Sequence, residues 1–437
     1  MCPPRFRFVR MLGCFVAVCA LTFAQGLVSA GDRHEGVASC AGSTCHGATR
    51  PFGDVPIRQD EYFIWQQKDA HARAYAVLLG ERAQRIGRHL GIRPHEAPQC
   101  LVCHADYPAP ELRGERYLVS DGVGCEACHG GAGRWLAEHT RAGISAEEKQ
   151  QRGMTPLWKP EVRSRVCLQC HQGDAQHPIT HAMMAAGHPP LLFELYTFTG
   201  LSPPHYDWDD DYARRKSAPD AVRDWAVGQM VAAQVFLTEL ASGRLGQGGV
   251  FPELMYFDCN TCHHSLDAGR WTPGRTGPLP PGAPPLADTH LHWVGVWLDV
   301  VAPALADRWH RHWLGLQSAM ASGPAAVRAA AAAMLGLLER EILPLGLDRR
   351  LDAGQLRALL QAIAALPHTP RARDFSSAEQ AAMAALVFAG ALQARGERPG
   401  PTLDRAIDAL YAAVRSRDRF DPAQYHAALA ELQRALR

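Results

Sequence analysis

The sequence lacks a strong net charge. Its 437 residues carry 45 Lys and Arg against 44 Asp and Glu, which gives a formal charge of +1 at pH 7. Proteins that bind nucleic acids usually present a clearly basic surface, because they neutralise phosphates. The even balance of charge therefore argues against a nucleic-acid partner.

The sequence also lacks a clear membrane span. At the N-terminus three arginines precede an apolar core from Met11 to Phe23, and small residues follow up to Ala30. This order is typical of a secretory signal peptide, and the core is shorter than the roughly 20 residues of a membrane span. We therefore predict a signal peptide over residues 1–30, export to the periplasm or beyond, and no membrane span in the mature chain.

The mature chain has no spare cysteine. Of 13 cysteines, three lie in the predicted signal peptide, and the other ten form five close pairs, each followed directly by a histidine. An exported protein usually uses its cysteines for disulfides, and here none is left for one. The five motifs consist of Cys40, Cys45 and His46; Cys100, Cys103 and His104; Cys125, Cys128 and His129; Cys167, Cys170 and His171; and Cys259, Cys262 and His263.

Four of these motifs have the spacing C-x-x-C-H, the attachment signature of c-type haem, and the first is wider, CAGSTCH. Two thiols three residues apart can form thioether bonds to the two vinyl groups of one porphyrin, which leaves the adjacent imidazole beneath the iron. Structural zinc sites also use paired cysteines, but zinc does not require a histidine after each second cysteine. We predict five covalent haem c groups, with the five motif histidines as proximal iron ligands. The prediction of a haem at Cys40 and Cys45 depends on a wider and less usual spacing than the other four.

Each iron has a second axial position, which another histidine can fill. Several histidines outside the motifs stand in short stretches with helical character: His71, His139, His181, His188 and His290. We predict that His71, His139 and His188 are ligands, and we keep His181 and His290 as further candidates. Weaker candidates are His34, His95, His177, His205, His264 and His292.

The chain changes character near Pro278–Pro285, where PLPPGAPP predicts an extended linker. Residues 31–284 carry all five motifs and many Gly and Pro, whereas residues 285–437 contain no cysteine. In the second region Val327, Ala331 and Met334 fall on one helical face, and Pro344 is expected to end that helix. We predict a mostly α protein: a multihaem domain with little regular β structure, followed by a C-terminal helical bundle.

The order of motifs resembles a known family. GVGCEACHGGAGRWLAEHTRAG, preceded by HARAY and CLVCH and followed by RVCLQCH, is similar to the tetrahaem cytochromes c that accept electrons from hydroxylamine oxidoreductase, and to the wider multihaem family related to them. The likeness spans about Cys40 to Phe193. It implies that His139 ligates the first iron, His71 the fourth and His188 the third.

The same resemblance leaves the second haem, on His104, five-coordinate, although His89 and His95 lie nearby in the sequence. The chain departs from the family in two ways: its first motif is wider, and it adds a fifth motif and a helical tail. The distal ligand of the fifth haem is therefore not implied by the resemblance. We take His290 as the first choice and His181 as the second.

A row of closely spaced haems suits the transfer of single electrons between two redox proteins, with the protein providing ligation, burial and spacing. We therefore predict an electron carrier and assign no catalytic residue. One alternative is a multihaem reductase or oxidase of a small nitrogen or sulfur compound, which needs an open iron and proton donors. Another is a subunit of an electron-conducting assembly with histidines donated between molecules. The sequence leaves the oligomeric state open.

Overall fold

The computed structural model describes residues 33–51, 57–207, 209–216, 220–243, 252–263, 279, 283–366, 375–397 and 400–437. The predicted signal peptide, part of the predicted linker and His264 lie outside the described residues.

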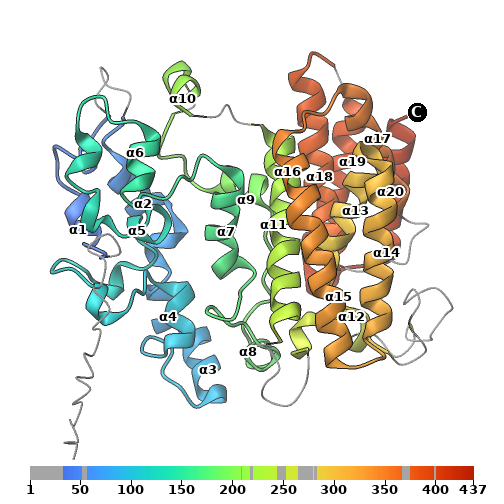
Figure 1. Ribbon diagram of the computed structural model, residues 1–437, viewed down its shortest axis with the longest axis horizontal. Coiled ribbons are helices and arrows are strands. Elements are labelled where there is room, and N and C mark those ends of the chain that lie inside the picture. The colour runs from blue at the N-terminus through green and yellow to red at the C-terminus, as the bar shows by residue number, and fades with distance from the viewer. Residues whose placement is uncertain are drawn as a thin grey trace, which may run out of the picture.

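Helices dominate the described residues. The β pairing found there consists of two isolated bridges, between His34 and Arg113 and between Phe257 and Leu286. Figure 1 shows many short helices on one side of the long helix α11 (Ala221–Ser242) and long, roughly parallel helices on the other. The predicted fold class, mostly α with a helical C-terminal part, is thus confirmed.

The first part of the chain consists of short helices separated by turns. Its α-helices are α1 (Val37–Cys40), α2 (Glu61–Lys68), α3 (Glu81–Leu90), α4 (Pro98–His104), α5 (Cys125–His129), α6 (Ala146–Gln151), α7 (Pro160–His171), α8 (His181–Ala185), α9 (Leu195–Leu201), α10 (Asp210–Arg215) and α12 (Cys259–Cys262). Single 3₁₀ turns lie between them, among them η2 (Ala70–Arg73) and η7 (Glu138–Thr140).

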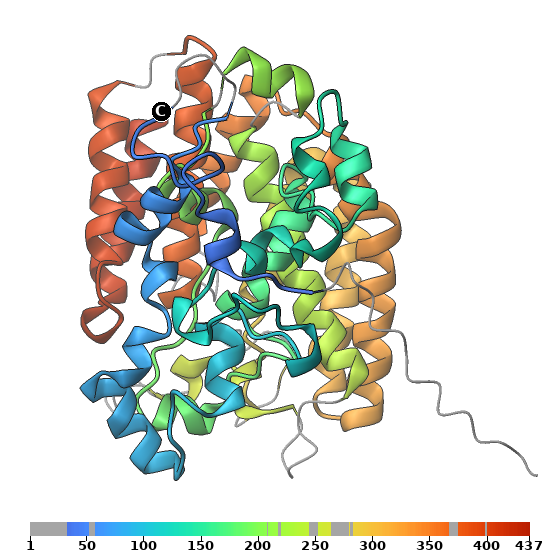
Figure 2. The ribbon, with the colours of Figure 1, turned by 90° about the vertical axis from the view of Figure 1, so that its left-hand side faces the viewer.

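The C-terminal part is a set of longer helices. They are α13 (Thr289–Val301), α14 (Pro303–Ala319), α15 (Pro324–Leu337), α16 (Leu343–Asp348), α17 (Ala353–Ala364), α18 (Phe375–Ala394), α19 (Pro401–Ala413) and α20 (Pro422–Ala435). Figure 2 views the molecule from the side of the short helices, which cover one face of the longer ones.

Pro344 does not end the helix that precedes it, contrary to the sequence expectation. The π-helical turn η9 (Leu338–Ile342) follows α15, and Pro344 then lies in the first turn of α16. Proline is tolerated there because the first turn of a helix needs no backbone donor from it. The wider π turn thus lets the chain stay helical past the proline.

Helix α11 connects the two parts of the structure. Asp220 caps its N-terminus by accepting a hydrogen bond from the Arg223 amide, and Gly243 ends it in the left-handed conformation. It contacts α7 and α9 on one side and α13, α15, α16 and α18 on the other. Because α11 precedes the predicted linker, the hydrophobic core extends across residue 284.

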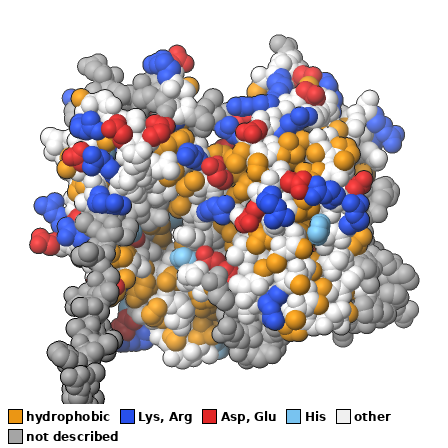
Figure 3. Space-filling model, viewed as in Figure 1, with side chains coloured by type: hydrophobic (Ala, Val, Ile, Leu, Met, Phe, Trp, Pro, Cys, Tyr) orange, Lys and Arg blue, Asp and Glu red, His pale blue; other side chains and the backbone are white. Residues whose placement is uncertain are grey.

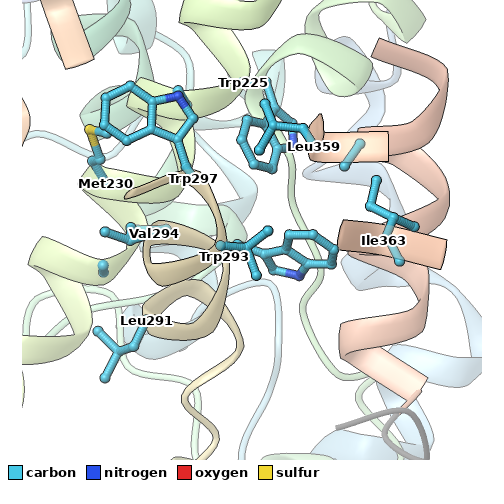
Figure 4. Packing of buried hydrophobic residues seen from close by; sticks show 14 of the residues in the cluster. Trp225, Met230, Leu291, Trp293, Val294, Trp297, Leu359 and Ile363 are labelled. Carbon is cyan, nitrogen blue, oxygen red and sulfur yellow. The ribbon is translucent and has the colours of Figure 1, made fainter. Parts of the chain in front are cut away.

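Large aromatic side chains fill the core around α11. Trp225 is fully buried, with its ring centre 6.1 Å from that of Trp293 and 4.8 Å from that of Phe388, both edge to face. Figure 4 shows Trp225 and Met230 beside the tryptophans of α13. Edge-to-face contacts between aromatic rings stabilise a core beyond their area alone.

The first part has little hydrophobic core of its own. Among the described residues, its separate cluster of buried apolar side chains contains Leu78, Leu101 and Ala105. The large cluster draws mainly on α11 and the C-terminal helices, and takes Leu168, Phe193 and Leu195 from the segments that pack on α11. The short helices therefore bury few apolar side chains against one another.

Helix α18 is the one helix in the described part of the chain that is long and apolar enough to cross a membrane by length and composition. However, 78% of its apolar window is buried inside the structure. A core helix of a helical bundle has this property.

We expect Trp225→Ala to lower the free energy of unfolding by about 3–5 kcal/mol, because it leaves a cavity in the closed core around α11. The measurement is denaturant unfolding of the purified holoprotein. Leu386→Ala is the control, since Leu386 lies on α18 but is 47% exposed, and its effect should stay within about 0.5 kcal/mol. Equal effects of the two substitutions would contradict this account of the core.

Candidate haem-binding sites

The cysteine motifs form or end short helices. Three of the α-helices, α4, α5 and α7, have the motif histidine as their last residue, and His263 directly follows α12. Residues three or four apart share a face of a helix, so the two thiols and the imidazole of each motif are presented together. None of the ten cysteines of the five motifs forms a disulfide within the described residues. We number the sites one to five by motif order.

The wider first motif keeps one backbone feature of the others. The amide of His46 donates to the carbonyl of Cys40 at 3.1 Å, just as the amide of His263 donates to that of Cys259 at 2.7 Å. The two extra residues form a turn, in which the amides of Cys45 and Gly47 donate to the Gly42 carbonyl. A Cβ at Gly47 would collide with the carbonyl oxygen of Ala41, so glycine allows this turn. The first motif therefore presents its histidine much as a C-x-x-C-H motif does.

The helix of the third site is tightly bounded. Gly130, with φ +80°, ends α5 directly after His129, and a Cβ there would lie 2.8 Å from the Gly153 carbonyl oxygen. The Glu126 carboxylate, 3% exposed, accepts hydrogen bonds from the amides of Glu35, Gly36 and Ala132. His34, Asp106 and Glu126 lie close enough to hold a metal ion. Because Glu126 already accepts three backbone hydrogen bonds, two of them from residues 35 and 36, we interpret this group as the anchor of the N-terminal segment.

Every motif histidine faces a second histidine. Two imidazoles that bind opposite sides of one metal ion, each through a bond of about 2 Å, have ring centres roughly 6 Å apart. The observed separations all fit one iron between two rings. They are 6.1 Å for His46 and His139, 6.4 Å for His104 and His188, 6.4 Å for His129 and His205, 6.1 Å for His71 and His171, and 6.1 Å for His181 and His263.

Two of these pairs are the ones that the resemblance assigns. The structure brings His139, on η7, to His46 of site one, and His71, on η2, to His171 of site four. His181, the second choice for the fifth haem, begins α8 and faces His263.

The structure differs from the resemblance at sites two and three. His188 faces His104 rather than His129, so the second site is not left without a distal histidine. His205, a weaker candidate in the sequence, faces His129. It lies in the loop SPPHYD after α9, where two prolines interrupt any helical pattern in the sequence. The one sequence signal for His205 was numerical, since five motif histidines require five partners.

The structure places His290, the first choice for the fifth haem, inside the helical core, while His181 is the histidine that faces His263. Nδ1 of His290 lies 2.8 Å from Oε1 of Gln229 on α11. Gln229 in turn donates to Gln380, which donates to the backbone of Phe193. Burial lowers the pKa of His290 to about 4. This histidine belongs to a polar network inside the helical core.

The rings of the pairs are oriented by hydrogen bonds at Nδ1. The Nδ1 atoms of His104, His139 and His188 lie within hydrogen-bond distance of the backbone carbonyls of Ala74, Leu136 and Pro189. A carbonyl can only accept, so Nδ1 carries the proton and Nε2 keeps the lone pair that binds a metal.

Burial keeps several of these imidazoles neutral, which is the state that binds a metal. It lowers the pKa of His129 to about 3 and that of His171 to about 4. It also lowers the pKa of His139, His188 and His205.

The cysteines reveal which sites are neighbours. Contact with the Cys125 thiol raises the pKa of Cys40, which joins sites one and three. Contact with the Cys103 thiol raises the pKa of Cys170, which joins sites two and four.

Sites three and four are neighbours as well. Burial raises the pKa of Cys128 to about 12, and the nearby Cys167 and Cys170 of site four add to the rise. The order of neighbouring sites is thus one, three, four, two, which we call the order of contact. Site five shares a segment with site two, because His181 and His188 lie on α8 and just after it.

The motif cysteines differ in their exposure. Cys45 of site one and Cys259 and Cys262 of site five are exposed, Cys40 of site one is buried, and the cysteines of sites two, three and four are half-buried. On the face in Figure 3, Lys and Arg side chains are interspersed with Asp and Glu.

These features define a c-type cytochrome, and comparison with known families agrees. Residues 39–130 match the model of the family described as Cytochrome c554 and c-prime. The match covers the first three motifs and supports covalently bound haem c and a part in electron transfer. Comparison with curated proteins and with solved structures found no match.

We expect His205→Ala to convert one low-spin haem of the oxidised protein to the high-spin form, because site three would lose one of its two imidazoles. Electron paramagnetic resonance (EPR) measures the change. His290→Ala is the matched control and should leave the haem signals as they are. A high-spin signal from the His290 variant and none from the His205 variant would reverse the two assignments.

Proposed function

We propose that the protein is an exported pentahaem cytochrome c that passes single electrons between redox proteins. The observation that carries this proposal is the set of five opposed imidazole pairs, one for each cysteine motif. Cys40, Cys45, Cys100, Cys103, Cys125, Cys128, Cys167, Cys170, Cys259 and Cys262 would attach the porphyrins. When bound, haem supplies one-electron chemistry at its iron.

The pairing favours a carrier over an enzyme. A reductase or oxidase of a small nitrogen or sulfur compound needs an iron with an open axial position. The resemblance leaves the second iron open for such a reaction, but His188 faces His104 in this chain. Two imidazoles on each iron leave electron exchange as the remaining chemistry.

The pairing also weakens the case for an assembly in which histidines are donated between molecules. Each motif histidine already has a partner from the same chain, and these partners lie between residues 71 and 205. Contact between molecules is therefore not needed to complete any of the five sites.

The order of neighbouring sites supports a route through the protein. Cysteine contacts join sites one and three and sites two and four, and the cysteines of sites three and four lie near one another. Exposed cysteines at sites one and five suit exchange with a donor and an acceptor protein. The specific likeness to acceptors of hydroxylamine oxidoreductase would make an electron-releasing oxidoreductase the class of donor.

We expect the mature chain to carry five covalent haems, with the first at Cys40 and Cys45. Mass spectrometry of the denatured holoprotein measures the number, and the variant with both Cys40 and Cys45 replaced by Ala should lose one haem. Four haems together with free thiols at Cys40 and Cys45 in the unmodified protein would remove the wide motif from the haem sites.

We expect neither cyanide nor nitric oxide to bind readily to the native protein, because a distal histidine would occupy the second axial position of each iron. Optical and EPR spectra measure binding, and turnover of nitrite, hydroxylamine and tetrathionate with an artificial electron donor measures activity. The His188→Ala variant, which opens site two, is the positive control for binding. Rapid turnover of any of these compounds by the native protein would overturn the carrier proposal.

A further inference from the structure

Two of the paired histidines are hydrogen-bonded at Nδ1 to carboxylates instead of backbone carbonyls. Oε2 of Glu61 lies 3.0 Å from Nδ1 of His46 at site one, and Oδ1 of Asp69 lies 2.9 Å from Nδ1 of His71 at site four. Both carboxylate side chains are largely shielded from solvent, with 17% and 13% of their surface exposed.

One helix delivers both carboxylates. Glu61 is the first residue of α2, and Asp69 directly follows its last residue. The amide of Tyr62 donates to the His46 carbonyl at 2.9 Å, which fixes the start of α2 against site one. At the other end, Asp69 also accepts a hydrogen bond from the His71 amide at 3.0 Å, which fixes it against site four.

Sites two and three have a different arrangement. His104 and His188 of site two lie against backbone carbonyl oxygens, and so does His205 of site three. A carbonyl accepts the Nδ1 proton without carrying a full negative charge. Sites one and four therefore differ from these sites in the acceptor that directly contacts Nδ1. Glu61 and Asp69 also act on His205 of site three, but through electrostatics at a distance, because the backbone of Pro203 is the hydrogen-bond partner of His205.

A carboxylate on Nδ1 has a defined effect on a metal-bound imidazole. It draws the Nδ1 proton towards itself and makes the ring a stronger electron donor. A stronger donor with a nearby negative charge stabilises ferric over ferrous iron, since the ferric form carries the additional positive charge. The potential of that haem falls.

We propose that Glu61 and Asp69 are positioning residues that make sites one and four the lower-potential haems relative to sites two and three. This inference rests on the proposed function, because it assumes iron between the paired rings. In the order of contact, one, three, four, two, lower and higher potentials then alternate. An electron passing along this order takes alternating downhill and uphill steps between adjacent sites.

The ring planes allow the two sites to be told apart. The planes of the imidazoles are 15° apart at site one and 29° apart at site five, but 84° or 85° apart at sites two, three and four. Parallel ligand planes separate the energies of the two iron dπ orbitals, whereas perpendicular planes leave them nearly equal. Ferric haems of the first kind give rhombic EPR signals, and those of the second kind give one highly anisotropic signal.

The test is an EPR-monitored redox series on the holoprotein and its Glu61→Gln and Asp69→Asn variants. Each substitution keeps an acceptor of the same shape and removes the charge. Glu61→Gln should shift one rhombic signal to higher potential, and Asp69→Asn should shift one highly anisotropic signal. At a fixed applied potential the ratio of ferric to ferrous iron at that site should fall on the order of tenfold.

Two further variants separate charge at the ligand from other effects. Asp60→Asn removes a carboxylate next to Glu61 in the chain, but this carboxylate pairs with Arg58 instead of a histidine, and it should shift neither signal appreciably. Glu61→Asp retains the charge and should stay closer to the native potential than Glu61→Gln. If the Glu61→Gln protein fails to bind its haem, the potential of the Glu61→Asp protein still tests the role of this carboxylate.

The outcomes are distinct. Five low-spin haems whose potentials do not move in Glu61→Gln and Asp69→Asn would overturn this inference and leave the carrier proposal standing. Shifts of equal size in Asp60→Asn would also overturn it, because the effect would then be general electrostatics. Fewer than five haems, or high-spin iron in the native protein, would instead count against the proposed function itself.

Discussion

The first part of the structure depends on one geometric constraint, the opposition of two imidazole rings about 6 Å apart. Ten rings meet this constraint in five pairs, and the two members of each pair come from separate segments of the chain. Hydrogen bonds at Nδ1 tie many of these rings to carbonyls or carboxylates close by in the fold. The path of the backbone there follows the pairs, which explains why its helices are short.

The same constraint explains why the two parts of the fold have different interiors. The first part buries few apolar side chains against one another, so porphyrins held between the rings would provide much of its interior. Helix α7 carries the fourth motif at its end and packs against α11. Through α11 the haem part rests on a core of tryptophan, leucine and alanine side chains that needs no cofactor.

The sequence predicted the features that are local and missed those that depend on long-range contact. The spacing of Cys125, Cys128 and His129 is local, so the motif and its presentation were predictable, and the helical periodicity of the C-terminal part was as well. Pairing is not local, because His129 meets a histidine from the loop after α9. His290 was misleading for the complementary reason, since its helical context served a polar network in the core. Pro344 misled because the π turn before it could not be foreseen from the residues alone.

In the proposed carrier, burial and coordination both determine with what each haem can exchange electrons. Two imidazoles on each iron would keep the ligand set unchanged between oxidation states and would leave no position for a substrate. Neither cysteine of site three is among the exposed ones, so this site would exchange electrons mainly with its neighbours. Cys45 and Cys259 are exposed. In the proposed carrier, electrons would therefore enter and leave at sites one and five, and the carboxylates that α2 holds at sites one and four would create differences in potential between neighbouring sites.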